Sequence, residues 1–254
     1  MLKRWVLLAC LLWACQAARA DVLIVADEFP AMQVLAAKLR ADQGIASQLV
    51  AQTNMPASLS AFEAVIVYIH LGLLESAEAA FIAYTQQGGK LIVLHHSISS
   101  GKRRNRDWFP FLGVSLPEGD VERGGYKWTE GVTLEMVKLA PDHFITTNRV
   151  DYPARISWRG GEADAAERLL PGFVLPHSEV YLNHVLAGPR TLLLGLKYTD
   201  AASGKTYEQT HAGWVKPSAK GWIVYLMAGH STLDFQDPTY SRLVLNAVAW
   251  NAPH

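Results

Sequence analysis

Short, continuously apolar runs constrain the fold of this chain more than any other feature. Runs at 21–26, 64–69 and 90–94 consist almost wholly of Val, Ile, Leu and Ala, without polar alternation. This pattern is typical of parallel strands that are covered on both faces. The segments 30–42 and 75–87 have apolar residues at helical spacing. Strands and helices that alternate in this way predict an α/β fold with a doubly wound, mainly parallel sheet.

The middle of the chain has a different composition. Residues 97–188 contain many aromatic residues and glycines with weak periodicity, so we expect long inserted loops with short strands such as 155–158. No linker, repeat or low-complexity tract marks a boundary, and 21–254 is therefore expected to be a single domain. The other predicted elements are strands at 45–50, 191–198, 210–215 and 222–227 and an amphipathic helix at 240–250.

Residues 1–20 have the organisation of a signal peptide. Two basic residues precede an apolar segment that is too short to span a bilayer, and Ala-Arg-Ala at 18–20 is a small-x-small cleavage pattern. The mature chain is expected to begin at Asp21, in the periplasm or outside the cell, without a transmembrane segment. The alternative is a lipoprotein signal in which Cys15 is lipidated.

Cysteine content and charge exclude several functions. Both cysteines, Cys10 and Cys15, lie within 1–20, so the mature chain has no disulfide, no cysteine nucleophile and no thiolate metal ligand. A metal would have to be held by His, Asp, Glu or carbonyl oxygens. The whole chain has 23 basic and 23 acidic residues, and three of the basic ones lie within 1–20. The mature chain is therefore slightly acidic, which argues against a nucleic-acid-binding surface.

Residues that can bind a metal or transfer a proton directly follow four of the predicted strands. Ligands of open parallel sheets bind beyond the carboxyl ends of the strands, so these side chains are predicted to converge in one crevice. Strand alternation would turn His95 and His96 to opposite sides, and His96 is predicted to face the crevice. The alternatives are that Asp27 and Glu28 cap the next helix and that each histidine is a hydrogen-bonded core residue. The strand-end residues are Asp27, Glu28, His70, His95, His96, Ser97 and His230.

Two features of the middle section allow either a structural or a functional interpretation. The basic run at 102–106 is either a solvated loop or a basic lip that attracts an anionic or polyhydroxy ligand. The aromatic side chains either stack on sugar rings or pack the loops. These aromatic residues are Trp108, Tyr126, Trp128 and Tyr181.

Several motifs resemble the ThuA-like (trehalose utilisation) family. Residues 220–250, with Gly-His-Ser at 229–231 and a final Arg-Leu-Val-Leu-Asn-Ala-Val-Ala-Trp, are similar to the C-terminal block of that family. Residues 88–97 resemble its strand that ends in Leu-His-Ser, 178–181 its "DE.Y" element and 142–146 its "HPIT" segment. The resemblance covers nearly all of the mature chain. It implies a class I glutamine amidotransferase-like, flavodoxin-related fold.

The resemblance also implies where a functional site would lie. His96, His230 and Glu179 fall in the family's "LHS", "GHS" and "DE.Y" motifs. They are the predicted catalytic residues and the candidate ligands of a divalent metal such as zinc. The family's usual Asp is replaced by Ser178, which removes one carboxylate from this element. The predicted ligand-binding residues are Asp27, Glu28, His70, Ser97 and Tyr181.

The expected function is that of a secreted protein of carbohydrate metabolism with a small carbohydrate ligand. Its histidine-centred, metal-dependent or metal-free site would act as a sugar-directed hydrolase or isomerase. A glutaminase reaction is excluded because no cysteine stands at the position that amidotransferases use. The alternative is a non-catalytic sugar-binding or scaffold protein, which would bind its ligand without turnover.

Overall fold

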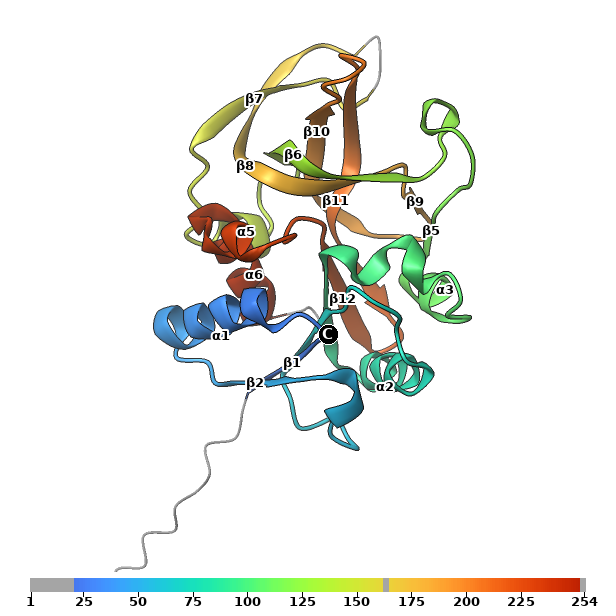
Figure 1. Ribbon diagram of the computed structural model, residues 1–254. Helices are drawn as coiled ribbons and strands as arrows, with labels where there is room; N and C mark the ends of the chain where they lie inside the picture. The colour runs from blue at the N-terminus through green and yellow to red at the C-terminus, as the bar shows by residue number, and fades with distance from the viewer. Residues whose placement is uncertain (1–20, 162–164, 252–254) are drawn as a thin grey trace, which may run out of the picture.

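A ten-stranded sheet runs through the protein in the computed structural model, which describes residues 21–161 and 165–251 (Figure 1). The strand order is β2-β1-β3-β4-β12-β11-β10-β6-β8-β7, and β5 (Val114–Ser115) pairs with β9 (Val185–Leu186) in a separate ribbon. The predicted signal peptide and Cys15 lie outside the described residues.

The first five strands of that order pair in parallel. They include three strands from the apolar runs, β1 (Val22–Ala26), β3 (Ala64–Tyr68) and β4 (Lys90–Leu94), which are buried almost throughout. β2 (Ser47–Val50) lies at one edge and β12 (Gly221–Leu226) continues the parallel pairing beside β4. This arrangement corresponds to the 2-1-3-4-5 strand order of flavodoxin-like sheets.

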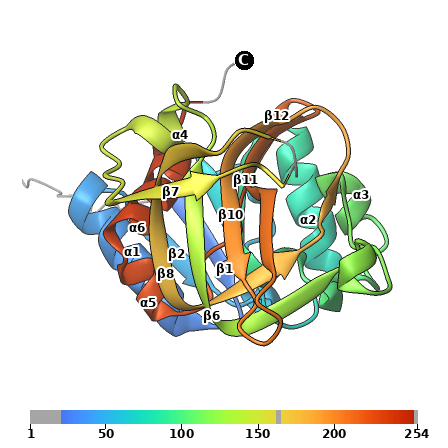
Figure 2. The same cartoon turned by 90° about the horizontal axis from the view of Figure 1, so that it is seen from above.

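Helices lie on both sides of the parallel strands (Figures 1 and 2). α1 (Phe29–Gln43) begins with Pro30 in its first turn and ends at Gly44, whose φ of 69° is the left-handed conformation that glycine adopts most readily. On the same side lie α5 (Thr232–Gln236) and α6 (Pro238–Ala249). No helix within the described residues is both long and apolar enough to cross a membrane. The other helices are α2 (Glu75–Gln86) and α3 (Trp108–Leu112), on the opposite side, and α4 (Phe144–Thr147).

The middle of the chain forms long strands, so the prediction of a loop-rich middle is wrong. β6 (Lys127–Lys138) and β8 (Arg168–Leu182) pair over most of their length, and β7 (Ala154–Trp158) pairs with β8. Together with β10 (Thr191–Thr199) and β11 (Thr206–Ser218) they extend the sheet with antiparallel pairs. The sheet is therefore mixed rather than mainly parallel. Register shifts in the β6–β8 pair and its many exposed positions hide the strand pattern in the sequence.

Short 3-10 segments connect the elements around the parallel strand ends. The most important is η2 (His95–Ile98), which follows β4 directly and is completely buried. The others are η1 (Gln52–Asn54), η3 (Ser100–Lys102) and η4 (Val121–Arg123).

Candidate active site

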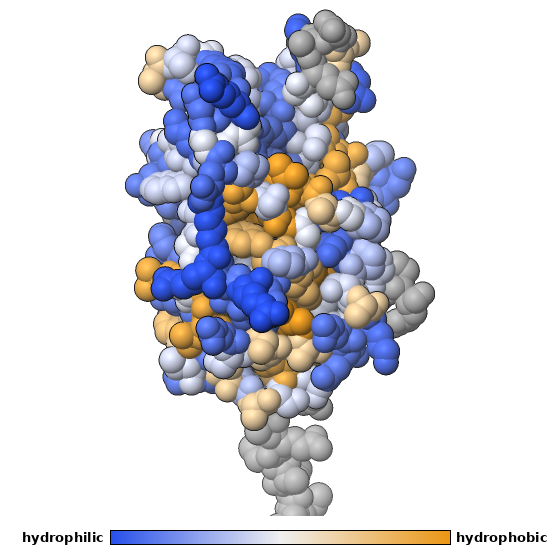
Figure 3. Space-filling model, turned by 90° about the vertical axis from the view of Figure 1, so that its right-hand side faces the viewer, coloured by the Kyte–Doolittle hydropathy of each residue, from blue (hydrophilic) through white to orange (hydrophobic). Residues whose placement is uncertain are grey.

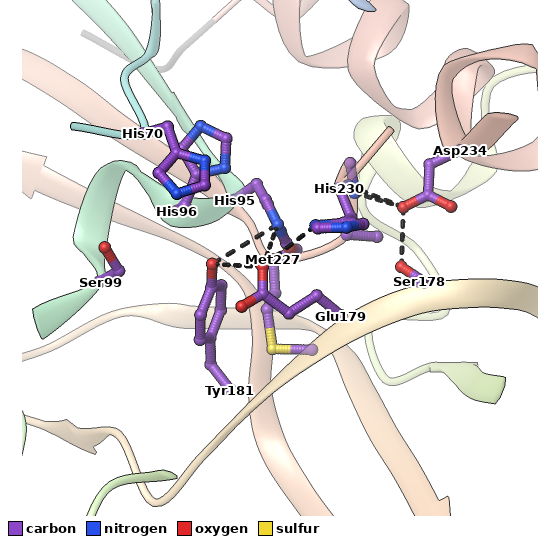
Figure 4. A network of polar contacts seen from close by, with 12 residues as sticks. His70, His95, His96, Ser99, Ser178, Glu179, Tyr181, Met227, His230 and Asp234 are labelled. Atoms are coloured by element: carbon purple, nitrogen blue, oxygen red, sulfur yellow. Dashed lines mark hydrogen bonds and ion pairs between the residues drawn. The ribbon is translucent and has the colours of Figure 1, made fainter. Parts of the chain in front are cut away.

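The strand ends predicted to converge are adjacent in the sheet. β1, β3, β4 and β12 are neighbours and parallel, so their carboxyl ends meet at the same edge. β8 crosses this edge and brings Glu179 to the residues that follow β4 and β12 (Figure 4). The site thus combines residues of the parallel half with a residue of the antiparallel half.

A single carboxylate oxygen lies at the centre of the site. Glu179 Oε2 is 2.8 Å from His95 Nε2, 2.8 Å from the Tyr181 hydroxyl and 3.2 Å from His230 Nδ1 (Figure 4). Glu179 is buried, and so are His95 and Tyr181. Hydrogen bonds to a charged acceptor are stronger in such a water-poor environment, which favours a fixed arrangement of the four side chains.

The contacts of His95 restrict its protonation. Its Nδ1 lies 2.6 Å from the carbonyl oxygen of Met227, and a carbonyl oxygen can only accept, so Nδ1 carries a proton. The other ring nitrogen, Nε2, faces Glu179 Oε2. His95 also has a φ of 51°, a left-handed conformation that non-glycine residues rarely adopt away from functional sites.

The carboxylate and His230 shift each other's protonation. Burial raises the pKa of Glu179, but the hydrogen bonds from His230 and His95 outweigh it and hold this pKa well below its usual range. The hydrogen bond to Glu179 raises the pKa of His230 above its ordinary value, against a smaller opposing effect of burial. The pair therefore favours a carboxylate beside a protonated imidazole.

Asp234 holds the chain segments that carry Glu179 and His230. Its Oδ2 accepts hydrogen bonds from the Ser178 hydroxyl at 2.7 Å and from the backbone N–H groups of Gly229 at 3.1 Å and His230 at 2.8 Å. Gly229 has a φ of 115°, and a Cβ there would lie 2.7 Å from the Tyr240 hydroxyl, so only glycine fits. Ser178, the departure from the family motif, is thus the residue that links β8 to this turn.

A cavity of about 370 Å³ opens beside Glu179, within the usual range of about 300–1,000 Å³ for small-molecule pockets. His230 is not among its lining residues and contacts the cavity wall through Glu179. Residues from several elements line it, including His70, His96, Arg104, Trp128, Glu130, Glu179 and Tyr181.

His96 faces this cavity, and neither of its ring nitrogens has a hydrogen-bond partner in the part of the chain that the structure describes. Burial and the neighbouring positive groups hold its pKa far below the ordinary value, so it is a neutral imidazole. Of the two adjacent histidines, His96 lines the cavity and His95 does not, although both belong to the 3-10 segment η2 and not to a strand, as the alternation argument assumed. Their ring centroids are 4.8 Å apart, and His95, which the prediction set aside, is the partner of Glu179.

Two of the predicted ligand-binding residues support the backbone and do not line the cavity. The carboxylate of Asp27 accepts hydrogen bonds from the backbone N–H groups of His70 and Leu71, both at 2.7 Å. The Ser97 hydroxyl donates to the carbonyl oxygen of Val67 and accepts from the N–H of Ile69. Both residues position the strand ends.

Glu28 does not cap α1, although it occupies the N-cap position. Its Oε1 lies 3.2 Å from His70 Nδ1. Asp27 and Glu28 therefore do not cap α1, which was the structural alternative to a role in the ligand site.

The basic run at 102–106 is not a simple solvated loop. Lys102 is fully buried, and its ammonium group donates to the carbonyl oxygens of His70 and His96, both at 2.7 Å. Burial lowers the pKa of Lys102 to about 7. Arg104 lines the cavity, so one residue of the run lies where the interpretation as a basic lip of the ligand site predicted it.

The aromatic residues of the middle section divide between packing and the cavity. Trp108 is fully buried against Phe81 and Phe111, and its indole N–H donates to the carbonyl oxygen of Ser97. Trp128 is half exposed and lines the cavity. Trp128 is therefore the aromatic face that a ligand in the cavity can reach.

Glu130 is a site residue that the sequence did not reveal. It lies directly opposite Glu179 in the β6–β8 pair and lines the same cavity. Like charges opposite each other destabilise a strand pair, so this juxtaposition indicates a functional constraint. Only the pairing of β6 with β8 brings the two carboxylates together, and no local sequence signal predicts it.

Other hollows on the molecule lack this combination of groups. One of about 400 Å³ is lined mainly by apolar residues of α3 and β5, on the face where apolar residues gather in Figure 3. Another, of about 740 Å³, is lined by His184, His211 and Glu208 but by no Phe, Tyr or Trp among the described residues. The cavity beside Glu179 is the candidate site because acid, base and aromatic groups converge there.

Within residues 21–161 and 165–251, two groups of three side chains could hold a metal ion. Each places its donor atoms within 4.8 Å of one another: His95, Glu179 and His230 form one group, and Glu28, His70 and His96 form the other. The predicted metal ligands His96, His230 and Glu179 are thus divided between two groups rather than united in one.

Comparisons with known proteins agree on the family and the fold. The ThuA family model, described as trehalose utilisation, matches residues 21–251. No functionally curated protein matches the sequence.

Solved structures with a similar fold include two ThuA-like proteins. The one from Bacteroides uniformis is 19% identical with a TM-score of 0.62, over 91% of each chain. The one from Parabacteroides merdae is 13% identical with a TM-score of 0.64, over 90% of this chain and 88% of that chain. A β-galactosidase from Rahnella sp. R3 is 13% identical with a TM-score of 0.54, and the similarity covers 91% of this chain but 31% of the enzyme. At these identities the likeness establishes the fold alone.

Proposed function

Because the chain belongs to the ThuA family, whose model is described as trehalose utilisation, we propose that it is a sugar-directed enzyme. It transfers protons at the site centred on Glu179, as a hydrolase or an isomerase. The observation that carries the proposal is the buried Glu179 oxygen, which accepts hydrogen bonds from His95, His230 and Tyr181 at the wall of a ligand-sized cavity.

His230 lies beside Glu179 and outside the cavity lining, and its proposed role is to exchange a proton with a ligand that extends past Glu179. Its Nδ1 faces Glu179, its Nε2 has no hydrogen bond to any residue that the structure describes, and 26% of its side chain is exposed. A histidine whose pKa is raised by a carboxylate can give a proton to a leaving oxygen and take it back from water or a sugar hydroxyl near neutral pH. His95 fixes the carboxylate from the other side.

The cavity has the chemistry expected for a sugar. Trp128 offers an apolar ring face, Glu130 accepts hydrogen bonds from hydroxyl groups, and Arg104 donates to them. Small-molecule sites combine such an apolar surface with a few directed polar groups.

Purified residues 21–254, assayed against a panel of disaccharides and oxidised sugars, test the proposal. Turnover that is lost in Glu179→Gln supports it. Saturable sugar binding without turnover in the parent would replace it with the non-catalytic sugar-binding alternative. Trp128→Ala should weaken sugar affinity without changing the melting temperature, and Glu118→Gln, whose side chain is 87% exposed, is the neutral control.

We also propose that the protein acts outside the cytoplasm. This rests on the signal-peptide pattern of residues 1–20. Mass spectrometry of the exported form should find Asp21 as the first residue, and a lipidated N-terminal Cys15 would show that the lipoprotein alternative is right.

A further inference from the structure

A second cluster of ligand-type side chains lies beside the Glu179 network and takes no part in it. Glu28 follows β1, His70 follows β3 and His96 follows β4, so three adjacent strand ends supply one residue each. Glu28 Oε1 is 3.2 Å from His70 Nδ1, and the His70 and His96 ring centroids are 4.7 Å apart. One carboxylate oxygen and one nitrogen from each imidazole lie within 4.8 Å of one another.

The buried ring nitrogens of His96 lack partners among the residues that the structure places, which favours a bound ligand at this cluster. Its side chain is 2% exposed, and neither ring nitrogen has a hydrogen-bond partner among the described residues. Buried polar atoms are almost always paired, and an unpaired one costs about 1–3 kcal/mol. His96 also lines the cavity with His70. A cation bound to one of its nitrogens would satisfy a group that the protein itself leaves unsatisfied.

The backbone around the cluster is held in place independently of the three side chains. Asp27 accepts the N–H groups of His70 and Leu71, and Lys102 donates to the carbonyl oxygens of His70 and His96. The carboxylates of Asp27 and Glu179 offset the positive charge of Lys102 near the site. The His70 and Glu28 side chains are about half exposed, so an ion can reach them from solvent.

We propose that Glu28, His70 and His96 bind one divalent metal ion, with zinc as the best match. Two imidazoles and one carboxylate are a donor set of catalytic zinc sites, which keep the fourth position open for water or substrate. Here the open position would face the cavity beside Glu179. In the Glu179 group, by contrast, the donor atoms are already hydrogen-bonded to one another. The three proposed zinc ligands are not the residues of the proposed proton transfer, and zinc binding can be measured without any sugar.

The experiment is a calorimetric titration of untagged residues 21–254, stripped with a chelator and dialysed, with zinc chloride alone. The parent should bind one zinc ion per chain at this site. His70→Ala and Glu28→Gln should each weaken the affinity by more than about tenfold without loss of folding, since both side chains are half exposed. Glu118→Gln is the matched carboxylate control and should bind as the parent does.

Glu179→Gln distinguishes the two candidate clusters and should leave zinc affinity unchanged. Crystals soaked in zinc chloride should give an anomalous difference peak between Glu28, His70 and His96. The proposal is overturned if the parent binds no zinc, if His70→Ala and Glu28→Gln bind as tightly as the parent, or if the peak lies at His95, Glu179 and His230.

Discussion

Replacing Asp234 by alanine is expected to lower the free energy of unfolding by about 3–5 kcal/mol. Asp234 is buried, and its Oδ2 accepts from the Ser178 hydroxyl and from the N–H groups of Gly229 and His230. One hydrogen bond to a charged group contributes about 1.5–3 kcal/mol. The three bonds share one oxygen and are not additive, so the expected loss is that of breaking one buried charged network, about 3–5 kcal/mol.

Urea unfolding followed by circular dichroism measures this loss. With a slope of about 3 kcal/mol per molar urea for a chain of this size, the midpoint should fall by roughly 1–2 M while the slope stays constant. Ser178→Ala is the matched control, because it removes one donor and leaves the carboxylate with two. It should cost about 1.5–3 kcal/mol and less than Asp234→Ala.

The position of His230 provides a second readout. Because its backbone N–H and that of Gly229 are both bonded to Asp234, the alanine variant should also loosen the His230–Glu179 contact and lower the pKa of His230, seen by NMR of the imidazole protons. An Asp234→Ala variant within 1 kcal/mol of the parent, or equal to Ser178→Ala, would refute the role given to this carboxylate.

Three further predictions concern the buried ionisable groups. In Glu179→Gln the pKa of His230 should fall. Folding lowers the pKa of Glu179 below about 4.3 and raises that of His230 above about 6.5, so the variant should be least stable relative to the parent between these two pH values. The difference in stability should shrink as the pH falls below about 4.3 or rises through the folded pKa of His230. Burial lowers the pKa of Lys102 to about 7, so its buried charge destabilises the fold fully below pH 7. From pH 7 to 9 the parent should gain stability over Lys102→Met by on the order of 1 kcal/mol per pH unit in urea titrations. A stability difference between parent and variant that does not change with pH would contradict this. His95→Gly relieves the strain of a left-handed backbone, about 1 kcal/mol, but removes a hydrogen bond to a buried carboxylate that contributes about 1.5–3 kcal/mol. The melting temperature of this variant should therefore fall, and a rise would show that the strain is the larger effect.

The parallel half of the fold could be predicted because its strands are covered on both faces. Continuous apolar runs such as 64–69 and 90–94 correspond closely to β3 and β4. Helix ends followed local signals as well, as with Pro30 and Gly44 at the two ends of α1.

The antiparallel half could not be predicted in the same way. β6 has many exposed and charged positions, and its register with β8 shifts at Val132. Its pairing depends on residues far apart in the chain, which no local pattern reveals. β6 and β8 were therefore taken for loops, whereas the predicted strands 155–158, 191–198 and 210–215 correspond to β7, β10 and the middle of β11.

The strand ends predicted the location of the candidate site, but not which side chains form hydrogen bonds with one another. Histidines after parallel strands predicted where side chains would gather. His96, the residue chosen to face the crevice, does line the cavity. The contact of His95 with Glu179 was missed because the strand stops at Leu94 and the chain turns through a left-handed residue, which strand alternation cannot anticipate. The contact of Asp234 with Ser178 and the position of Glu130 opposite Glu179 depend on pairings between residues far apart in the chain.

The most direct test of a Glu179-centred enzyme is to compare sugar binding and turnover in the parent and in Glu179→Gln. Calorimetry gives the Kd and steady-state kinetics give kcat for the sugar that the panel identifies. Loss of the carboxylate that orients His230 should lower kcat by about 10²-fold or more, while the Kd stays close to that of the parent because cavity residues such as Trp128 are unchanged. An unchanged kcat in Glu179→Gln would contradict the account.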